Sequence, residues 1–401
     1  MRVLFVTWAW GSHFNPMVPL GWALRSAGHE VMVASHPAFA PTITAAGLPA
    51  LPAGEHRDLG EILQDTLTRS GWYANRHRRR RPGRQVQPDG TDRDSGSAMR
   101  RGITVLRIAA DSAEAMADDT VRFADRWQPD AVVYEPFGLL GPLLAARLDV
   151  PAARLLWTVD FLSTIGDVEQ ELLGDLATRI GATRINALGD VTLDPWPVPW
   201  PASHGSRRQP MRYVPYNGPA AEPAWLRRPK RRPRICVTWG TSLAGLGLND
   251  DLLAPAVVHA LGRHDVETVV AVVDSQRALF GVLPGNVVHI GRVPLDQLLP
   301  SCDAIVHQGG GGTTMTAVKN GLPQFVLPTL PDTTFNAEHV AGTGAGTYLP
   351  DAGTQTEVLS ARLDEFLAGL DGYREKAAQL QADHLAMPGP AEVVPMLERG
   401  L

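Results

Sequence analysis

Cysteine is scarce in this chain. Cys236 and Cys302 are the only two among 401 residues, which is too few for a disulfide framework or a multi-cysteine metal site. We therefore expect both thiols to stay reduced and to pack as small hydrophobic groups in a cytoplasmic protein. The sequence also lacks clusters of histidines and carboxylates with metal-ligand spacing, so we expect no bound metal.

Long hydrophobic runs are missing as well. None approaches the ~18 residues that a membrane-spanning helix needs, and residues 3–10 predict a short strand rather than a signal peptide, so we expect no membrane contact. A net charge of −5 gives no general field that would attract nucleic acid. The arginine-rich runs at residues 76–84 and 227–234 lack the interleaved aromatic residues of a single-strand nucleic-acid site, and we expect solvated loops there.

Strand and helix patterns alternate along the chain in two series. The first begins with a strand over residues 2–7, a helix over residues 16–27 and a strand over residues 30–34, and the second begins with a strand over residues 235–239. Between them, residues 195–233 are rich in proline and arginine and resist both helix and central strand. Alternation of this kind predicts parallel sheets, and the length of the chain predicts two doubly wound α/β domains.

Residues 72–100 interrupt the first series. They combine arginine, proline, glycine and aspartate with few apolar residues, which is typical of a mobile loop. We expect a helix to follow from about residue 104 to residue 127. Long loops of this kind often act as lids, so we expect this one to border a substrate.

The most informative segment is a glycine-rich loop near the C-terminus. Apolar residues 304–306 predict a buried strand, which leads through His307 to four glycines at 309–312 and a helix that Gly321 ends. Such a loop lets the backbone approach a diphosphate closely, the helix start offers N–H groups, and His307 can add a donor or a positive charge. The glycines alone are equally compatible with a tight turn. The patterns G-x-G-x-x-G and G-x-x-x-x-G-K-[ST] are absent, which disfavours nicotinamide enzymes and nucleotide hydrolases.

Two segments carry a family resemblance. From His307 through Gly321-Leu322-Pro323-Gln324 to Pro328, and on to Asp332-Thr333 and Asn336-Ala337, the chain resembles the donor-binding signature of family-one glycosyltransferases. The N-terminal segment, residues 7–16 with Pro19-Leu20 and residues 27–31, is similar to the region that holds the catalytic histidine of that family. The match is closest to the bacterial branch that glycosylates polyketide antibiotics, such as the urdamycin-type angucycline glycosyltransferases. It spans nearly the whole chain and is weakest between about residues 55 and 105.

The resemblance implies an α/β fold of the GT-B type, in which two doubly wound Rossmann-like domains face a cleft. An acceptor-binding domain is then expected over residues 1–212, a linker over residues 213–232 and a nucleotide-sugar-binding domain over residues 233–385. Residues 386–401 are expected to form a helix that returns to the N-terminal domain.

Donor binding is expected in the second domain. The resemblance implies contacts from Gly240, Thr241, Ser242, Arg292, Val293, His307, Gly309, Gly310, Gly311, Gly312, Thr313, Asp332 and Thr333. Plant relatives carry a stacking tryptophan where this chain has Arg292, although a guanidinium plane can also stack. Thr333 replaces a longer glutamine of the family, and its shorter reach favours a deoxysugar over glucose.

Catalysis is expected in the first domain. His13 matches the general base of the family, since a neutral imidazole can accept a proton from an acceptor hydroxyl. Glu135, at a strand end, either orients His13 or acts as the base itself, as is thought for relatives that build C-glycosides. Asp111 and Asp160 are weaker candidates for orienting His13. The residues expected to bind the acceptor are Trp8, Trp10, Phe14, Tyr73 and Trp157.

The sequence therefore predicts an inverting glycosyltransferase that moves a deoxysugar from a dTDP-sugar to an aromatic polyketide or a similar aglycone. Its partners would be this nucleotide-sugar co-substrate and a bulky hydrophobic aglycone, without nucleic acid, cofactor or metal. A nucleotide-sugar epimerase of the same fold and a non-catalytic helper protein are the alternatives. The aglycone, the sugar, O- or C-linkage, a homodimer and an auxiliary protein stay open.

Overall fold

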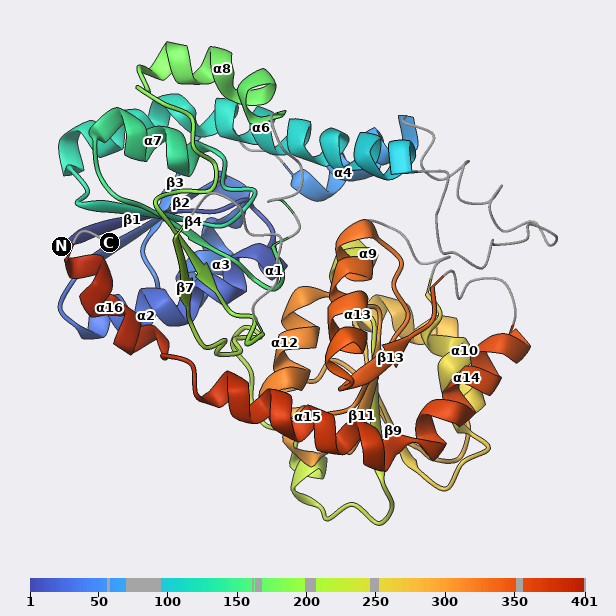
Figure 1. Ribbon diagram of the computed structural model, residues 1–401. Coiled ribbons are helices and arrows are strands. Elements are labelled where there is room, and N and C mark those ends of the chain that lie inside the picture. The colour runs from blue at the N-terminus through green and yellow to red at the C-terminus, as the bar shows by residue number, and fades with distance from the viewer. Residues whose placement is uncertain are drawn as a thin grey trace. The chain divides into compact units, whose positions relative to one another are not determined.

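The computed structural model describes residues 1–55, 58–69, 95–160, 162, 168–198, 207–245, 252–350 and 356–399. The chain divides into two compact units. Unit 1 comprises Met1–Leu59, Asp94–Pro219 and Leu385–Leu401, and unit 2 comprises Gly60–Arg93 and Ala220–His384. The division at Pro219 falls inside the expected linker, and the C-terminal segment is grouped with unit 1 (Figure 1).

Unit 1 is built on a parallel sheet of seven strands in the order β3-β2-β1-β4-β5-β6-β7. The inner strands β1, β4, β5 and β6 are buried as near-continuous rows, as expected for a parallel sheet that helices cover, whereas the edge strands β3 and β7 are partly exposed. Strand order reverses between β1 and β4, so the loops after these two strands diverge at the carboxyl edge, where open α/β sheets bind ligands. The strands are β1 (Arg2–Val6), β2 (Glu30–Ser35), β3 (Ala50–Pro52), β4 (Ala131–Tyr134), β5 (Ala152–Leu155), β6 (Val191–Asp194) and β7 (Arg207–Pro210).

The first helical region of this half of the chain differs from the sequence prediction. The helix expected over residues 16–27 is preceded by a separate short turn of helix, and a 3₁₀ segment with Pro16 joins the two. The segments are α1 (Gly11–Phe14), η1 (Asn15–Met17), α2 (Val18–Ser26), η2 (Pro37–Phe39), α3 (Ala40–Ala45), α4 (Leu59–Arg69), α6 (Ser95–Trp127), α7 (Leu140–Leu148), α8 (Val168–Ile180) and α16 (Pro390–Glu398).

The expected loop over residues 72–100 is partly wrong. Residues 72–94 and the basic run at residues 76–84 lie outside the described residues. Residues 95–100, however, already belong to α6. Ala98, Met99 and Arg100 are strong helix formers, and they outweigh the glycine and serines beside them.

The C-terminal helix α16 belongs to the core of unit 1. Val393, Val394 and Leu397 join the buried cluster that also contains Leu20 and Leu24 of α2. Figure 1 shows the N and C labels close together. His29 links the two terminal segments, since the Met1 amine donates to its Nδ1 and its Nε2–H donates to Glu398.

Unit 2 repeats the pattern with a parallel sheet of six strands in the order β10-β9-β8-β11-β12-β13. The reversal lies between β8 and β11, where Thr238 pairs with His307. The strands are β8 (Arg234–Thr238), β9 (Glu267–Ala271), β10 (Val287–Gly291), β11 (Ala304–His307), β12 (Gln324–Val326) and β13 (Gly346–Tyr348). The helical segments are η4 (Ala224–Arg227), α9 (Ser242–Gly245), α10 (Ala254–Leu261), η6 (Asp274–Phe280), α11 (Leu295–Leu298), η7 (Leu299–Ser301), α12 (Gly311–Lys319), α13 (Pro331–Thr343), α14 (Thr356–Ala368) and α15 (Leu370–Leu385).

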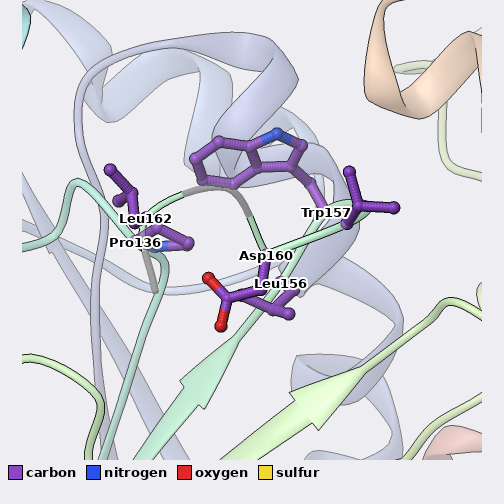
Figure 2. A pocket seen from close by; sticks show the side chains of 6 residues that line it. Pro136, Leu156, Trp157, Asp160 and Leu162 are labelled. Carbon is purple, nitrogen blue, oxygen red and sulfur yellow. The ribbon is translucent and has the colours of Figure 1, made fainter. Parts of the chain in front are cut away.

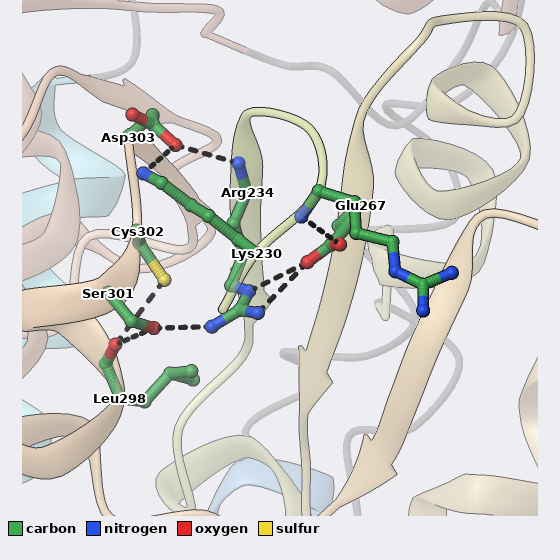
Figure 3. A network of polar contacts seen from close by, with 8 residues as sticks. Lys230, Arg234, Glu267, Leu298, Ser301, Cys302 and Asp303 are labelled. Atoms are coloured by element: carbon green, nitrogen blue, oxygen red, sulfur yellow. Dashed lines mark hydrogen bonds and ion pairs between the residues drawn. The ribbon is translucent and has the colours of Figure 1, made fainter. Parts of the chain in front are cut away.

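A polar network closes the amino edge of this second sheet (Figure 3). Arg234 is 4% exposed, and its guanidinium pairs with Glu267 at 2.9 Å while its backbone N–H donates to Asp303 at 2.8 Å. Lys230 pairs with the same oxygen of Asp303 at 2.5 Å, and the N–H of Arg231 donates to Glu267 at 2.8 Å. The expectation of a solvated loop over residues 227–234 is therefore wrong at Arg234, which two carboxylates hold in the fold.

Both cysteines are free and buried. Burial raises the pKa of Cys302 to about 12 and also raises the pKa of Cys236, so both thiols stay protonated and pack in the core of unit 2, as expected. Within the described part of the chain, no helix is long and apolar enough to cross a membrane.

Candidate active site

His13 and Glu135 meet at the carboxyl edge of the first sheet. β1 and β4 end side by side, since Val6 pairs with Tyr134. His13 lies in α1, in the connection after β1, and Glu135 directly follows β4. The Nδ1 atom of His13 lies 3.0 Å from Oε2 of Glu135. The strand-order reversal thus brings together two residues that are far apart in the sequence.

Glu135 is fully buried, and N–H donors occupy both of its oxygens. The backbone N–H of Trp8 donates to Oε1 at 2.8 Å, and that of Phe137 donates to Oε2 at 2.9 Å, beside the bond from His13. With Nδ1–H donating to Glu135, the lone pair of His13 lies on Nε2, which bonds no other described residue. The pair has the form of a base with an orienting carboxylate.

Aromatic rings surround the imidazole of His13. Trp157 lies 4.2 Å away between ring centroids, Phe137 stacks at 5.1 Å and Trp8 lies at 5.3 Å. Trp10 packs on Trp8 at 6.3 Å. The sequence analysis missed Phe137, although its place two residues after Glu135 in the same strand-end loop was a usable signal.

Some residues that the sequence predicted for this site have other roles in the structure, and one lies outside the described residues. Phe14 is fully buried in the core against Phe39, so it has a packing role rather than a surface that an acceptor could touch. Asp111 is exposed on α6 and Asp160 pairs with Arg154, so Glu135 alone of the three carboxylates orients His13. Tyr73 lies outside the described residues.

A shallow hollow adjoins the aromatic cluster (Figure 2). Its lining is apolar except for the carboxylate of Asp160, and it includes Trp157, whose ring faces His13. The lining residues are Pro136, Leu156, Trp157, Val159, Asp160 and Leu162.

The glycine loop of unit 2 follows β11 and begins α12. Gly309 has a φ of +88°, and a Cβ atom there would lie 2.7 Å from the backbone oxygen of Thr333. Asn336 Nδ2 donates to the carbonyl of Gly309 at 2.7 Å and fixes the turn. Helix α12 starts at Gly311 without a side-chain cap, and Thr313, in its first turn, is 8% exposed. The backbone N–H groups of Gly311, Gly312 and Thr313 are the natural anion donors of this helix end.

His307 is placed differently from the expectation. It is fully buried, its Nε2–H donates to Gln324 at 3.0 Å, and its Nδ1 accepts from the N–H of Gly309 at 3.1 Å. Burial lowers the pKa of His307 to about 4, so the ring is neutral near pH 7. The ring of His307 stabilises the glycine loop by accepting the hydrogen bond from Gly309, and it adds no positive charge to the site.

Gln308 is a residue that the sequence analysis missed. Its amide lies between two glycine turns, since a Cβ atom on Gly240 would lie 2.7 Å from Nε2 and one on Gly310 would lie 2.8 Å from it. Gln308 is 6% exposed, and its buried Oε1 has no hydrogen-bond partner among the described residues. A buried amide with spare capacity between two turns can bind a polar ligand group. The signal was its position between His307 and the glycines.

The remaining donor candidates occupy other strand ends of unit 2. Gly240, with a φ of +62°, follows β8 beside exposed Thr241 and half-buried Ser242. Arg292 is exposed after β10, where a planar guanidinium could cover a nucleobase, and Val293 packs in the core.

Thr333 has a structural role that the sequence analysis did not foresee. It is 3% exposed, and its hydroxyl donates to the carbonyl of Leu330 at 2.7 Å and accepts from the N–H groups of Thr329 and Leu330. The hydroxyl therefore completes the start of α13 and has no free group for a sugar. Asp332, in the same turn, is half-buried and favourably placed at the helix N-terminus.

Over the residues that the structure describes, no group of three or more His, Cys, Asp or Glu side chains is arranged to hold a metal ion.

Family models cover nearly the whole chain. The model "Erythromycin biosynthesis protein CIII-like, N-terminal domain" matches residues 22–240, and the corresponding C-terminal domain model matches residues 255–399. Tylactone mycaminosyltransferase from Streptomyces fradiae is 35% identical over 421 residues, which cover 100% of this chain and 92% of the relative. Aclacinomycin-T 2-deoxy-L-fucose transferase from Streptomyces galilaeus is 33% identical, with 100% and 96% covered.

Solved structures agree with these relatives. Spinosyn rhamnosyltransferase SpnG complexed with thymidine diphosphate has a TM-score of 0.80 and 30% identity, covering 99% of this chain and 100% of that one. The same enzyme complexed with spinosyn aglycone has a TM-score of 0.79. The two Rossmann-like units therefore form the GT-B fold that the sequence predicted.

Proposed function

Because the chain belongs to the erythromycin biosynthesis protein CIII-like family of glycosyltransferases, we propose that it transfers a deoxysugar from a dTDP-sugar to a polyketide aglycone with inversion. The sugar class is supported by the 2-deoxy-L-fucose transferase among its relatives, and the nucleotide by thymidine diphosphate in the related structure. Thr333 no longer supports the sugar class, since its hydroxyl is used within α13.

The hydrogen-bonded pair of His13 and Glu135 is the observation that carries this proposal. In the reaction, Nε2 of His13 takes the proton of an acceptor hydroxyl while the hydroxyl oxygen attacks the anomeric carbon. Glu135 stabilises the imidazolium that forms and keeps the ring in place. Attack from the face opposite the diphosphate inverts the anomeric centre.

The geometry of Glu135 favours an O-glycoside over a C-glycoside. Its carboxylate is fully buried and accepts three N–H hydrogen bonds. A carboxylate that must itself activate a phenol ring needs an oxygen within reach of that ring. In this pair, Nε2 of His13 is the basic atom that remains available to a substrate. An imidazole base suits a hydroxyl nucleophile.

In unit 2, the diphosphate leaving group is assigned to the start of α12. The N–H groups of Gly311, Gly312 and Thr313 and the helix dipole stabilise the negative charge that develops as the sugar leaves. The Nε2–H group of Gln308, which lies between the two glycine turns, is assigned as a further donor to a phosphate oxygen, and the neutral ring of His307 accepts from the N–H of Gly309 in the loop. This set of donors works without a metal.

A direct assay tests the proposal. The purified chain is incubated with a dTDP-2,6-dideoxysugar and a panel of macrolactone and aromatic polyketide aglycones, and products are identified by mass spectrometry and by NMR of the new linkage. We expect an O-glycoside of inverted configuration. Interconversion of the dTDP-sugar without an acceptor would instead identify an epimerase. Absence of both reactions, with transfer appearing only when a second glycosyltransferase is added, would identify a helper protein.

Two further features belong to this proposal. A cytoplasmic location fits the buried, free cysteines. Binding of a bulky hydrophobic aglycone fits the aromatic cluster around His13. A homodimer and an auxiliary protein stay open.

A further inference from the structure

A buried arginine lies in the interior of the first sheet. Arg154 is on β5 and is 1% exposed. Its Nε and Nη2 donate to Oγ1 of Thr192, on neighbouring β6, at 3.3 Å and 3.1 Å. Its Nη1 donates to Oδ1 of Asp160 at 3.2 Å, and its Nη2 pairs with Oδ2. Burying a guanidinium inside a sheet costs free energy unless it is paired in this way. Because a buried ion pair often adds little net stability, stability alone does not explain this one.

Asp160 lies only six residues after Arg154, so the ion pair closes the turn that follows β5. The side chain of Asp160 is 8% exposed. The turn itself contains Trp157, Thr158 and Val159, all of them buried. A two-pronged contact between a guanidinium and a carboxylate fixes both distance and orientation, so it limits how this turn can move.

The turn carries the aromatic ring nearest to the catalytic pair. Trp157 lies 4.2 Å from the imidazole of His13 with an interplanar angle of 35°, and 5.8 Å from Phe137. Glu135 holds Nδ1 of His13, but a single hydrogen bond leaves the imidazole free to rotate about it. Three rings restrict that rotation, and Trp157 is nearer to the imidazole than Phe137 or Trp8.

We propose that the ion pair of Arg154 and Asp160 is a positioning device for catalysis: it holds the turn that places Trp157 against His13. This rests on the proposed function, in which His13 is the base. Asp160 makes no direct bond to His13 and acts through Trp157. Asp160 and Trp157 also line the same small apolar hollow beside the site, so the two side chains pack in one local environment (Figure 2).

The chain provides a matched control. Asp194, on β6, forms another ion pair, with Arg208 at 2.5 Å, in which the side chain of Asp194 is 3% exposed and that of Arg208 is 22% exposed. It lies outside the turn that carries Trp157. Asp194→Asn therefore breaks an ion pair of the same sheet and removes a charge close to Asp160, but it leaves the contact between Arg154 and Asp160 in place. The change in stability that it causes, of either sign, serves as the baseline.

The first test needs no substrate. An indole 4.2 Å from an imidazole shifts the ring protons of His13 in the NMR spectrum, and His13→Gln identifies these signals. We expect Asp160→Asn and Trp157→Leu to move them to similar new positions, and Asp194→Asn to leave them in place. Unchanged His13 signals in folded Asp160→Asn would overturn the proposal, whether or not the chain is a glycosyltransferase.

The second test measures catalysis. We expect Asp160→Asn to lower kcat on the order of 10²-fold, the scale of a small misplacement of a catalytic group, with KM for the dTDP-sugar unchanged. The effect should be absent in the Trp157→Leu background, because both changes break one connection. If the two changes instead multiply, or if Asp194→Asn lowers kcat equally, Asp160 does not act through Trp157.

A double variant tests the proposal if Asp160→Asn does not fold. Should Asp160→Asn not fold, Arg154→Met combined with Asp160→Leu removes both charges together and leaves neither of them buried alone. We expect this double variant to be as stable as wild type and still to show the shifted His13 signals and the lower kcat. Wild-type signals and rates in it would overturn the proposal.

Discussion

His13 and His307 lie at the carboxyl edges of the two sheets, on different strands, and have different surroundings: His13 follows β1, and His307 ends β11, the counterpart of β4. Each lies at the carboxyl edge of a parallel sheet, beside the point where strand order reverses. His13 has a carboxylate on one nitrogen and its other nitrogen free among the described residues. His307 has uncharged partners on both nitrogens, and burial lowers its pKa to about 4. The partners differ accordingly: a carboxylate suits the base that we propose at His13, whereas His307 hydrogen-bonds the glycine loop as a neutral ring.

The largest expected effect is the loss of activity when the imidazole of His13 is removed. His13→Ala removes the base and should lower kcat by ~10²–10⁴-fold. Glu135→Gln should lower kcat less, because its single amide oxygen can still accept on one side, from Trp8 or from Phe137 and His13, although the charge that stabilises an imidazolium is lost. Steady-state kinetics with a saturating dTDP-sugar would measure both. A Glu135 variant far more damaged than the His13 variant would favour the C-glycoside mechanism instead.

The second prediction concerns the loop that His307 supports. Gly309→Ala forces a side chain into a left-handed φ and to within 2.7 Å of Thr333. We expect a loss of about 3 kcal/mol in the free energy of unfolding, together with weaker dTDP binding. Gly342→Ala is the control, since it lies in α13 with nothing within 4 Å of its Cβ position and should be neutral or slightly stabilising. Equal stability of the two variants would show that the loop is not strained in this way.

The third prediction uses the depressed pKa of His307. The unfolded chain binds a proton at this residue below about pH 6.5, whereas the folded chain does so only below about pH 4. Stability from the neutral ring is therefore complete above pH 6.5 and is lost as the pH falls toward 4. Between pH 7 and pH 5 the loss should be on the order of 2 kcal/mol.

Asp194 changes the free energy of unfolding with pH in the opposite direction to His307, so the two contributions must be separated. Burial raises its pKa to about 6, so the stability that its protonated form contributes is present at low pH and is lost as the pH rises through 6. His307→Gln leaves Asp194 in place. The difference between wild type and this variant in chemical denaturation at pH 7 and pH 5 isolates His307, and identical pH dependence would contradict the assignment.

The fourth prediction is smaller and separates Gln308 from His307. Gln308→Ala should weaken dTDP binding about tenfold, since one hydrogen bond to a charged group contributes about 1.5 kcal/mol. It should leave the pH dependence of stability unchanged. Calorimetric titration with dTDP measures the affinity, and unchanged binding would remove Gln308 from the donor site.

The smallest expected effect concerns metal removal, which we expect to leave the transfer rate unchanged. If the start of α12 alone stabilises the diphosphate, transfer rates with and without EDTA should agree. A rate that falls with EDTA and recovers with Mg²⁺ would show that backbone donors do not suffice.

Strand ends were predictable from the sequence, and side-chain partners were not. Apolar runs and glycines placed His13, Glu135 and the glycine loop correctly at the carboxyl edges, because sheet topology follows from the alternation of strands and helices. Three carboxylates competed for His13, and only the register of β1 against β4 selects Glu135. Thr333 and Phe14 were assigned to ligands because sequence does not show whether a hydroxyl caps a helix or a ring enters the core.

The network of Arg234, Glu267 and Asp303 has a consequence for engineering hybrid enzymes. It extends the folded body of the second half back to Lys230 and Arg231, whose contacts would be lost at a junction placed after residue 232. An exchange of donor halves between related transferases should therefore join the chains near Pro219. The recipient must also keep its own C-terminal segment from Leu385, because Val393 and Leu397 complete the core of unit 1.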